Sequence, residues 1–259
     1  MHIHFLRHAT LVLTIHNHKL LVDPMLSPLE AMDPVPDSGN LRRNPMVPLP
    51  ISDEELQQVL GNIDAVLVTH THADHWDPSA QAILPKHVPI LCQPEDQEKF
   101  EQAGFAEVHP VAERLAWRDL QIDRTGGQHG KGELGKRMAP TSGFVLHTDD
   151  EPTLYIAGDT VWCPEVEQAL QQFSPEVVIL NAGAPTFVTA GGPITMDADD
   201  VCQVARSIPG KKIVAVHMEA FNHCRLTRSA LQTRLIEEKL ENQVQIPQDG
   251  DTLTFAKMS

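Results

Sequence analysis

The hydrophobic pattern of the chain alternates between short apolar runs and amphipathic segments, as in proteins that mix strands and helices. Apolar runs typical of strands occupy residues 3–15, 18–24, 65–69, 88–92, 106–111, 144–148, 153–160, 176–183, 211–218 and 251–255. Segments with helical periodicity occupy residues 52–60, 79–84, 94–104, 164–173, 196–208 and 227–240. The first two runs meet at a polar tip, residues 16–18, which predicts a hairpin.

Local signals predict where several of these elements begin. Ser52, with Glu55 three residues later, forms a capping box that opens a helix. Asp77 followed by Pro78 predicts a second helix start. Between residues 25 and 50, repeated prolines disfavour both helix and central strand, so we expect a long ordered loop there.

The order of the elements indicates the fold class. Hairpins come early in the chain, and strand–helix units alternate later, which predicts an α/β fold. We expect a four-layer αββα sandwich, with two mixed β-sheets packed face to face and helices outside. The chain has 259 residues, 41% of them hydrophobic, so it can bury a sizeable core as one domain over residues 1–259.

Composition and charge exclude several classes of partner. A formal net charge of −15 argues against nucleic acid, because a polyanion would be repelled. No apolar run approaches the roughly 20 residues that a membrane span needs, and the first residues lack the features of a signal peptide. We therefore expect a cytoplasmic protein without integral membrane contact. The sequence is also compatible with a homo-oligomer.

Histidine is the residue that changes this picture, because its 14 copies gather in short segments. In VTHTHADHWD, His70 and His72 follow a predicted strand two residues apart, so their side chains point to the same side. Asp74 and His75 come next, where the chain turns. Imidazole and carboxylate suit zinc or another first-row divalent ion. Four potential ligands in six residues exceed what one tetrahedral ion takes locally, so two ions are expected.

The sequence THTHADH, with His129, Asp159 and His217 downstream, resembles the ligand signature of the metallo-β-lactamase superfamily, and the likeness spans nearly the whole chain. The resemblance implies a first metal held by His70, His72 and His129. It implies a second held by Asp74, His75 and His217, with Asp159 as the bridging carboxylate.

The residues alone leave other roles open for the downstream positions. His129 lies in the glycine-rich TGGQHGKG and could be a surface-loop histidine, Asp159 could cap a turn, and His217 could be a satisfied core histidine. His8, in RHAT, is similar to a position near the site in lactonase-like relatives, but a structural role is the preferred interpretation. Glu219 and His223 are candidates for the substrate pocket, or for shaping the loop that holds them.

Within the superfamily, HADHWDP and LVDP resemble the branch that contains ascorbate-6-phosphate lactonase, and also the N-acylphosphatidylethanolamine-hydrolysing phospholipase D. The resemblance implies cleavage of an ester, lactone or phosphodiester bond. A water bridging two ions about 3.5–4 Å apart is acidified to hydroxide near neutral pH, which supplies the nucleophile. Asp74 and Asp159 are the predicted catalytic residues, because either can orient that nucleophile and accept its proton. Zinc is the expected metal, with manganese or iron as alternatives.

The expected partner is a small, anionic metabolite. Lys131, Lys136 and Arg137 give the segment around His129 a basic character within an acidic chain, which favours an anionic substrate. An ordinary solvated charge run is the competing interpretation. Arg42 and Arg43 in the proline-rich loop could form a second clamp.

Two other functions fit the same residues. A mononuclear iron oxidoreductase of this fold would need only one ion. A non-catalytic metal-binding domain would bind metal without turning over any ester, lactone or phosphodiester.

Overall fold

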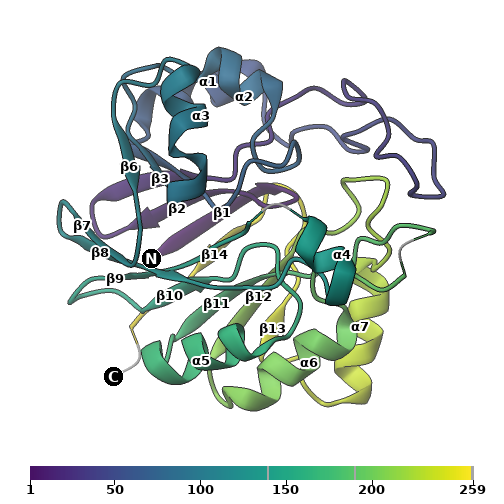
Figure 1. The fold of residues 1–259 in the computed structure, drawn as a ribbon. Helices are drawn as coiled ribbons and strands as arrows, with labels where there is room; N and C mark the ends of the chain where they lie inside the picture. The colour runs from purple at the N-terminus through teal and green to yellow at the C-terminus, as the bar shows by residue number, and fades with distance from the viewer. Residues whose placement is uncertain (139, 190, 258–259) are drawn as a thin grey trace.

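The structure is a computed structural model that describes residues 1–138, 140–189 and 191–257. Two seven-stranded sheets pack face to face between two layers of helices (Figure 1), which confirms the predicted four-layer sandwich. One outer layer consists of α1 (Asp53–Asn62), α2 (Pro78–Ile83) and α3 (Gln97–Gln102). The other consists of α5 (Pro164–Phe173), α6 (Ala198–Ser207) and α7 (Arg228–Glu237). A single domain over residues 1–259 stays a prediction.

Both sheets are mixed, as predicted. The first has the strand order β14 (Thr252–Thr254), β1 (His2–Arg7), β2 (Thr10–Ile15), β3 (His18–Val22), β4 (Ala65–Val68), β5 (Ile90–Cys92), β6 (Val108–Pro110). The second has the order β13 (Val244–Gln245), β12 (Lys212–Val216), β11 (Val177–Asn181), β10 (Leu154–Ile156), β9 (Gly143–His147), β8 (Leu120–Thr125), β7 (Arg114–Trp117). Pairing is parallel from β3 to β6 and from β10 to β13.

The predicted elements are largely present, with several differences. The apolar run 3–15 is not one strand, because the chain turns at His8, whose φ is 57°, and returns as β2. The hairpin β7–β8, the short helix α4 (Gly132–Arg137) and the strand β13 have no counterpart in the predicted pattern, and two of the four residues of β7 are exposed. The two predicted helix starts are confirmed: Ser52 forms its capping box with Glu55, and Asp77 accepts from the amide of Ala80.

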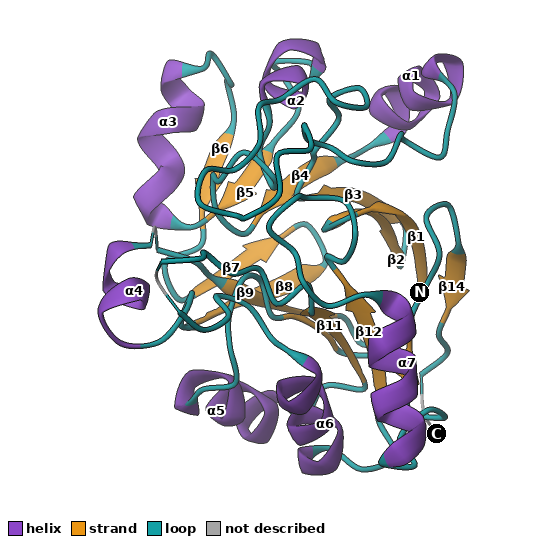
Figure 2. Cartoon of the chain, turned by 90° about the vertical axis from the view of Figure 1, so that its right-hand side faces the viewer, coloured by secondary structure: helices purple, strands orange, loops and turns teal. Residues whose placement is uncertain are grey.

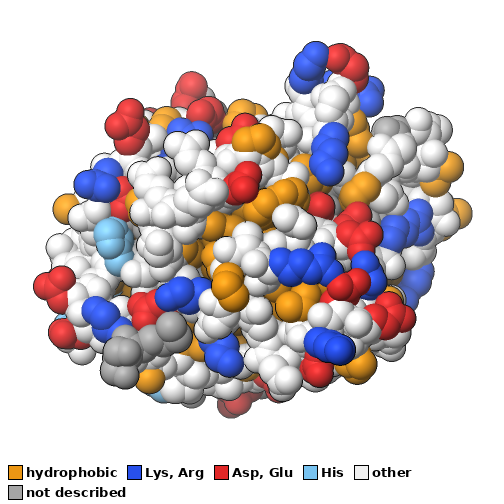
Figure 3. Space-filling view, turned by 90° about the horizontal axis from the view of Figure 1, so that it is seen from below, with side chains coloured by type: hydrophobic (Ala, Val, Ile, Leu, Met, Phe, Trp, Pro, Cys, Tyr) orange, Lys and Arg blue, Asp and Glu red, His pale blue; other side chains and the backbone are white. Residues whose placement is uncertain are grey.

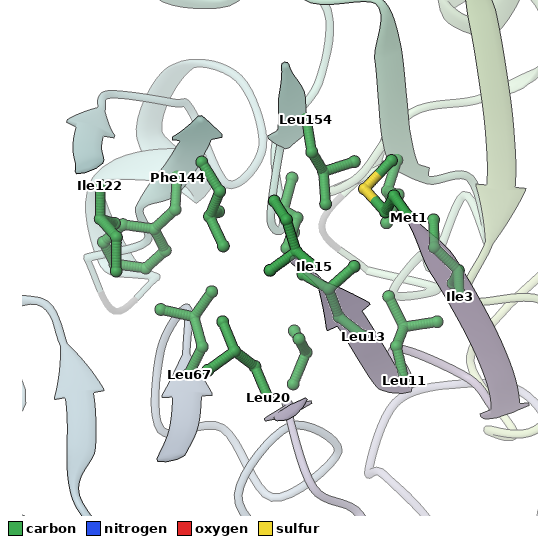
Figure 4. Packing of buried hydrophobic residues seen from close by; sticks show 14 of the residues in the cluster. Met1, Ile3, Leu11, Leu13, Ile15, Leu20, Leu67, Ile122, Phe144 and Leu154 are labelled. Atoms are coloured by element: carbon green, nitrogen blue, oxygen red, sulfur yellow. The ribbon is translucent and has the colours of Figure 1, made fainter. Parts of the chain in front are cut away.

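The core between the sheets consists of aliphatic and aromatic side chains from both inner faces. Leu13, Leu20 and Leu67 of the first sheet face Phe144 and Leu154 of the second (Figure 4). All five side chains are completely buried. Removing such a side chain leaves a cavity that costs about 2–5 kcal/mol, so this core fixes how the two sheets sit together.

Polar side chains anchor the long loop between β3 and α1. Asn222, on the loop after β12, exchanges hydrogen bonds of 2.9 Å with Asn44 and donates to Ser38 Oγ at 2.7 Å. The buried guanidinium of Arg7 donates to the carbonyl oxygens of Val47 and Met25. The loop is therefore ordered, as predicted, and it lies with other long loops at one end of the sandwich (Figure 2).

The outer helical face carries basic side chains interspersed with acidic ones (Figure 3). Arg234, on α7, pairs with Asp199 at 2.9 Å and with Glu238 at 2.6 Å, and Arg206 of α6 also pairs with Glu238. Among the described residues, no helix has both the length and the apolar character to cross a membrane.

Candidate metal centre

The cluster is built from residues that follow the ends of strands in both sheets. His70 comes just after β4, His129 after β8, and Asp159 after β10. His217 comes directly after β12, in a left-handed conformation with φ 72°. Because the two sheets face one another, segments far apart in sequence deliver their side chains to one place. The structure brings together all seven residues predicted as metal ligands.

Three histidines form a first subset of donor atoms, His70, His72 and His129. The Nδ1 atom of His72 lies 3.0 Å from His70 Nε2 and 3.2 Å from His129 Nε2. His70 and His129 are buried, whereas His72 is partly exposed. Solvent can therefore reach the cluster beside His72.

A second subset contains Asp74, His75 and His217, and a further histidine, His8. The Nε2 atoms of His75 and His217 are 3.1 Å apart. Asp74 Oδ2 lies 3.6 Å from His217 Nε2 and 3.9 Å from His75 Nε2. This subset is more deeply buried than the first, since His8, His75 and His217 have no exposed surface.

Asp159 lies between the subsets, with one oxygen toward each. Its Oδ1 is 3.3 Å from His75 Nε2 and 3.4 Å from His217 Nε2. Its Oδ2 is 3.5 Å from His129 Nε2 and 3.8 Å from His70 Nε2. Asn181, at the end of β11, donates to Oδ1 at 2.7 Å and holds the carboxylate in this orientation.

Hydrogen bonds at the outer ring nitrogens fix the tautomers of three histidines. His75 Nδ1 donates to Asp23 Oδ2 at 2.9 Å, and His129 Nδ1 donates to the carbonyl oxygen of Ile194 at 2.9 Å. Thr69 Oγ1 donates its one proton to Asp23, so it can only accept from His70 Nδ1. In the neutral rings, each Nε2 therefore presents a lone pair to the cluster.

The electrostatics of the cluster couple its carboxylates to its imidazoles. Burial raises the pKa of Asp159 and Asp74, but nearby imidazoles, above all His75, outweigh it and hold both pKa values well below their ordinary range. Burial disfavours the charged form of His75, but Asp159, Asp74 and Asp23 raise its pKa well above its usual value. Burial, joined by the neighbouring His75, holds the pKa of His70 well below its usual value.

The donor set fits divalent metal ions. Unprotonated ring nitrogens 3.0–3.2 Å apart repel one another unless a cation or a shared proton lies between them. Neutral imidazole and ionised carboxylate are the forms that bind zinc and similar ions. The first subset offers three donors, the second offers three besides His8, and Asp159 offers one oxygen to each, so two four-coordinate sites can be built from these residues.

The predicted substrate-binding residues are less closely tied to the cluster. Lys131 precedes the short helix α4 (Gly132–Arg137) without a capping hydrogen bond from its side chain, and Lys131, Lys136 and Arg137 are all exposed. Lys136 pairs with Glu133 at 2.5 Å and lines a hollow of about 420 Å³ that His129 also lines. The suggested second clamp is engaged within its own loop, where Arg43 pairs with Asp33.

Glu219 and His223 have different surroundings. Glu219 accepts from the backbone amide of Arg228 at 2.9 Å and from its guanidinium at 2.6 Å, so it fastens the loop after β12 to α7. His223 is buried against Phe187 and Phe221, and its Nδ1 has no hydrogen-bond partner within the described parts of the chain. Burial lowers the pKa of His223 to about 4, which leaves a neutral ring near Asp74.

Sequence reasoning missed several residues of the centre. His8, given a structural role above, contacts Asp74 directly, with Nε2 3.2 Å from Oδ2. Asp23 and Asn181 orient ligand candidates, and both stand at strand ends, a signal that could have drawn attention to them. Gly183 is required because a Cβ there would lie 2.2 Å from the carbonyl oxygen of His217.

Comparison with known proteins agrees with this geometry. The model of the beta-lactamase superfamily domain matches residues 7–218. The UPF0173 protein YddR of Bacillus subtilis (strain 168) is 35% identical, over 98% of this chain and 100% of YddR. The crystal structure of an isothiocyanate hydrolase from Delia radicum gut bacteria is 39% identical, with a TM-score of 0.92, and covers 99% of this chain and 100% of that one. A possible metal-dependent hydrolase from Veillonella parvula is 35% identical, with a TM-score of 0.93, over 98% and 99% of the two chains.

The fold and the histidine–aspartate cluster define a metal-dependent hydrolase. The chain belongs to the metallo-β-lactamase superfamily.

Proposed function

We propose that the protein holds two divalent ions, zinc foremost, and hydrolyses a small substrate at an electrophilic carbon or phosphorus atom. The position of Asp159 carries this proposal. One of its oxygens faces His70 and His129, and the other faces His75 and His217. A carboxylate shared in this way favours two ions over one, and so favours hydrolysis over the chemistry of a mononuclear iron oxidoreductase.

The chain's own residues have distinct tasks in this reaction. When bound, the two ions supply an acidified water and polarise the bond to be cleaved. Asp74 accepts the proton of the attacking water and returns it to the leaving atom. Asp159, held by Asn181, keeps the two subsets at a fixed separation. His72, the most exposed of the seven predicted ligands, lies where the substrate enters.

Two substrate classes are compatible with this chemistry. The first is the predicted anionic ester, lactone or phosphodiester, for which Lys136 supplies a cation beside His129. The second is an isothiocyanate, supported by the 39% identity to an isothiocyanate hydrolase over nearly the whole chain. We favour the second as the first substrate to test. Glycine backbone, Met138, Pro140 and Thr141 form most of the wall of the hollow beside His129, and its charged side chain, Lys136, is already paired with Glu133, so the hollow suits a small uncharged group.

The isothiocyanate reaction balances without another reactant. The oxygen of water bonds to the central carbon, and the nitrogen takes a proton, giving a thiocarbamate. Transfer of the second proton to nitrogen breaks the carbon–nitrogen bond and releases an amine and carbonyl sulfide. The net change is one isothiocyanate and one water giving one amine and one carbonyl sulfide. Asp74 is the group that carries the proton between oxygen and nitrogen.

The test is a substrate panel on protein reconstituted with zinc or manganese. Benzyl and allyl isothiocyanate are compared with uncharged and phosphorylated lactones, simple esters and bis(p-nitrophenyl) phosphate. Chelator-treated protein and the Asp159→Ala variant are the matched inactive controls. We expect metal-dependent amine release from isothiocyanates. Turnover of the lactones, esters or phosphodiester alone would assign the first class, and bound metal without turnover of any substrate would assign a non-catalytic metal-binding domain.

The likeness to the lactonase branch, the cytoplasmic location and a homo-oligomeric state stay predictions from the sequence. The substrate panel tests the likeness to the lactonase branch, cell fractionation tests the location, and light scattering of the purified chain tests the oligomeric state.

A further inference from the structure

His8 stands apart from the ligands predicted from the sequence, although it reaches the same cluster. It occupies the turn between β1 and β2 and is completely buried. Its Nε2 lies 3.2 Å from Asp74 Oδ2, the oxygen that faces His75 and His217. His8 is therefore either another metal ligand or a partner of Asp74.

We propose that His8 is a positioning residue that holds Asp74 by donating a hydrogen bond from Nε2 to Oδ2. The inference rests on the proposed function, because it concerns how Asp74 serves the metal centre and the reaction. An ionised carboxylate only accepts hydrogen bonds, so the proton between the two atoms belongs to His8. One lone pair of Oδ2 is then fixed by His8, and the others remain available to an ion.

The remaining ring nitrogen of His8 supports this tautomer. His8 Nδ1 is buried without a hydrogen-bond partner among the described residues. If Nδ1 carried the proton, a buried N–H would be unsatisfied, and the bare Nε2 would face the bare oxygen of Asp74. With the proton on Nε2, the stronger, charge-assisted bond forms, and only an acceptor is left without a partner.

The ligand sets are complete without His8. His75, His217, Asp74 and one oxygen of Asp159 make four donors, one more than the three protein ligands that a catalytic zinc site usually has. His75 and His217 both lie within 3.4 Å of Asp159 Oδ1. His8 instead contacts Asp74, and its ring lies against that of His217 at a tilt of 35°. To bind an ion, its Nε2 would have to give up the hydrogen bond to Asp74.

The local backbone holds His8 in this position. Its φ of 57° is unusual for a residue with a side chain, and its carbonyl oxygen accepts from the amide of His217 at 2.8 Å. The ring centroid lies 3.6 Å from that of His217 and 5.0 Å from that of Phe221. Such backbone strain persists where the surroundings over-determine it. The turn that breaks the first apolar run therefore delivers one donor to Asp74.

Two substitutions separate donation from packing. His8→Gln keeps an N–H donor at the distance of Nε2, whereas His8→Phe keeps a flat ring without a donor. If His8→Phe does not fold, His8→Leu serves as the variant without a donor. His147→Gln is the matched control, because His147 pairs with Asp123 away from the cluster. Each variant is loaded with Co²⁺, and its metal content, visible spectrum and kinetics are compared with those of the wild type.

We expect both His8 variants to bind as many ions as the wild type. His8→Phe should lose about 10–100-fold in kcat, the usual effect of removing a partner of a metal ligand. Its Co²⁺ spectrum should change, while KM should change by less than about threefold. His8→Gln should recover most of the rate and the wild-type spectrum, and His147→Gln should match the wild type in all measurements.

Two results would overturn the proposal. Loss of one ion per chain in both His8 variants would make His8 a ligand. Equal rates and spectra for His8→Gln and His8→Phe would reduce its role to packing. If the wild type hydrolyses nothing in the substrate panel, the proposed function fails, but metal content and spectra still decide the role of His8.

Discussion

The metal centre and the nearby helix α4 show two different ways in which charged residues are held. In the centre, Asp159 contacts four histidines from three separate segments and takes a hydrogen bond from Asn181. On α4, Lys136 pairs with Glu133 one turn away, with 73% and 85% of the two side chains exposed. Exposed pairs of this kind contribute about 0–1 kcal/mol. Substitutions should therefore have large effects in the centre and small ones on α4.

Asp159→Ala should have the largest effect, because it removes the carboxylate between the two subsets. We expect kcat to fall by more than about 100-fold, since loss of a mere partner of a ligand already costs about 10–100-fold. The measurement is turnover by reconstituted protein, with circular dichroism to confirm folding. A rate within tenfold of the wild type would contradict the shared-carboxylate arrangement.

Asp23→Asn should have the next largest effect, because Asp23 orients His75 and accepts from both the amide and the hydroxyl of Thr69. Both oxygens of Asp23 accept hydrogen bonds, so an amide nitrogen in place of either one loses at least one of these bonds. We expect metal affinity or kcat to fall by about 10–100-fold, measured by chelator competition and steady-state kinetics.

Asp119→Asn is the matched control, because Asp119 also pairs with a histidine, His18, but lies at the exposed turn between β7 and β8. An equal effect of the two substitutions would show that the histidine–carboxylate pair in the centre has no special role.

Replacing Lys131 and Lys136 together by Gln should have a small effect on an uncharged substrate. We expect kcat/KM for benzyl isothiocyanate to stay within about twofold, because both side chains are exposed and Lys136 already has an acidic partner. KM for a phosphorylated lactone should rise if these lysines bind an anion. Equal increases for both substrates would count against a role in charge recognition.

The smallest expected effect is on the pH dependence of the free energy of unfolding, through Asp123, a carboxylate outside the centre. Burial raises the pKa of Asp123, but hydrogen bonds from Arg114, Gln121 and His147 outweigh it and lower the pKa below its usual value. This carboxylate therefore stabilises the fold above its unfolded pKa of about 3.9, and the contribution is lost as the pH falls through the lower folded pKa.

Urea unfolding of wild type and Asp123→Asn tests this at pH 7 and at a series of values below 4. The destabilisation by Asp123→Asn should be largest at pH 7 and shrink on acidification. A difference that does not change with pH would contradict the assignment.

The sequence predicted the fold well because local signals agreed with the packing. The capping box at Ser52 and the cap at Asp77 lie within single turns of chain, and both are confirmed. The buried strands are apolar along most of their length, as in β11 and β12, where only Asn181 and Lys212 are polar. The strand β7 was missed because it lacks a continuous apolar run, and the turn at His8 was missed because it lies inside one.

The metal-ligand candidates could be predicted because imidazoles and carboxylates in a short segment need partners. The contacts of His8 and Asn181 could not, because they depend on how two distant segments meet in space. Glu219 illustrates the reverse: it follows His217 closely in sequence, yet its carboxylate points to Arg228. Residues that position the ligands therefore become evident only once the two sheets are in place.

The number of metal ions per chain tests the central claim most directly. Protein purified without chelators, reconstituted with zinc and freed of loose metal, can be analysed by inductively coupled plasma mass spectrometry against its amino-acid content. The arrangement of donors around Asp159 predicts close to two ions per chain, falling in Asp159→Ala. A value that stays near one after reconstitution, unchanged in that variant, would contradict the account.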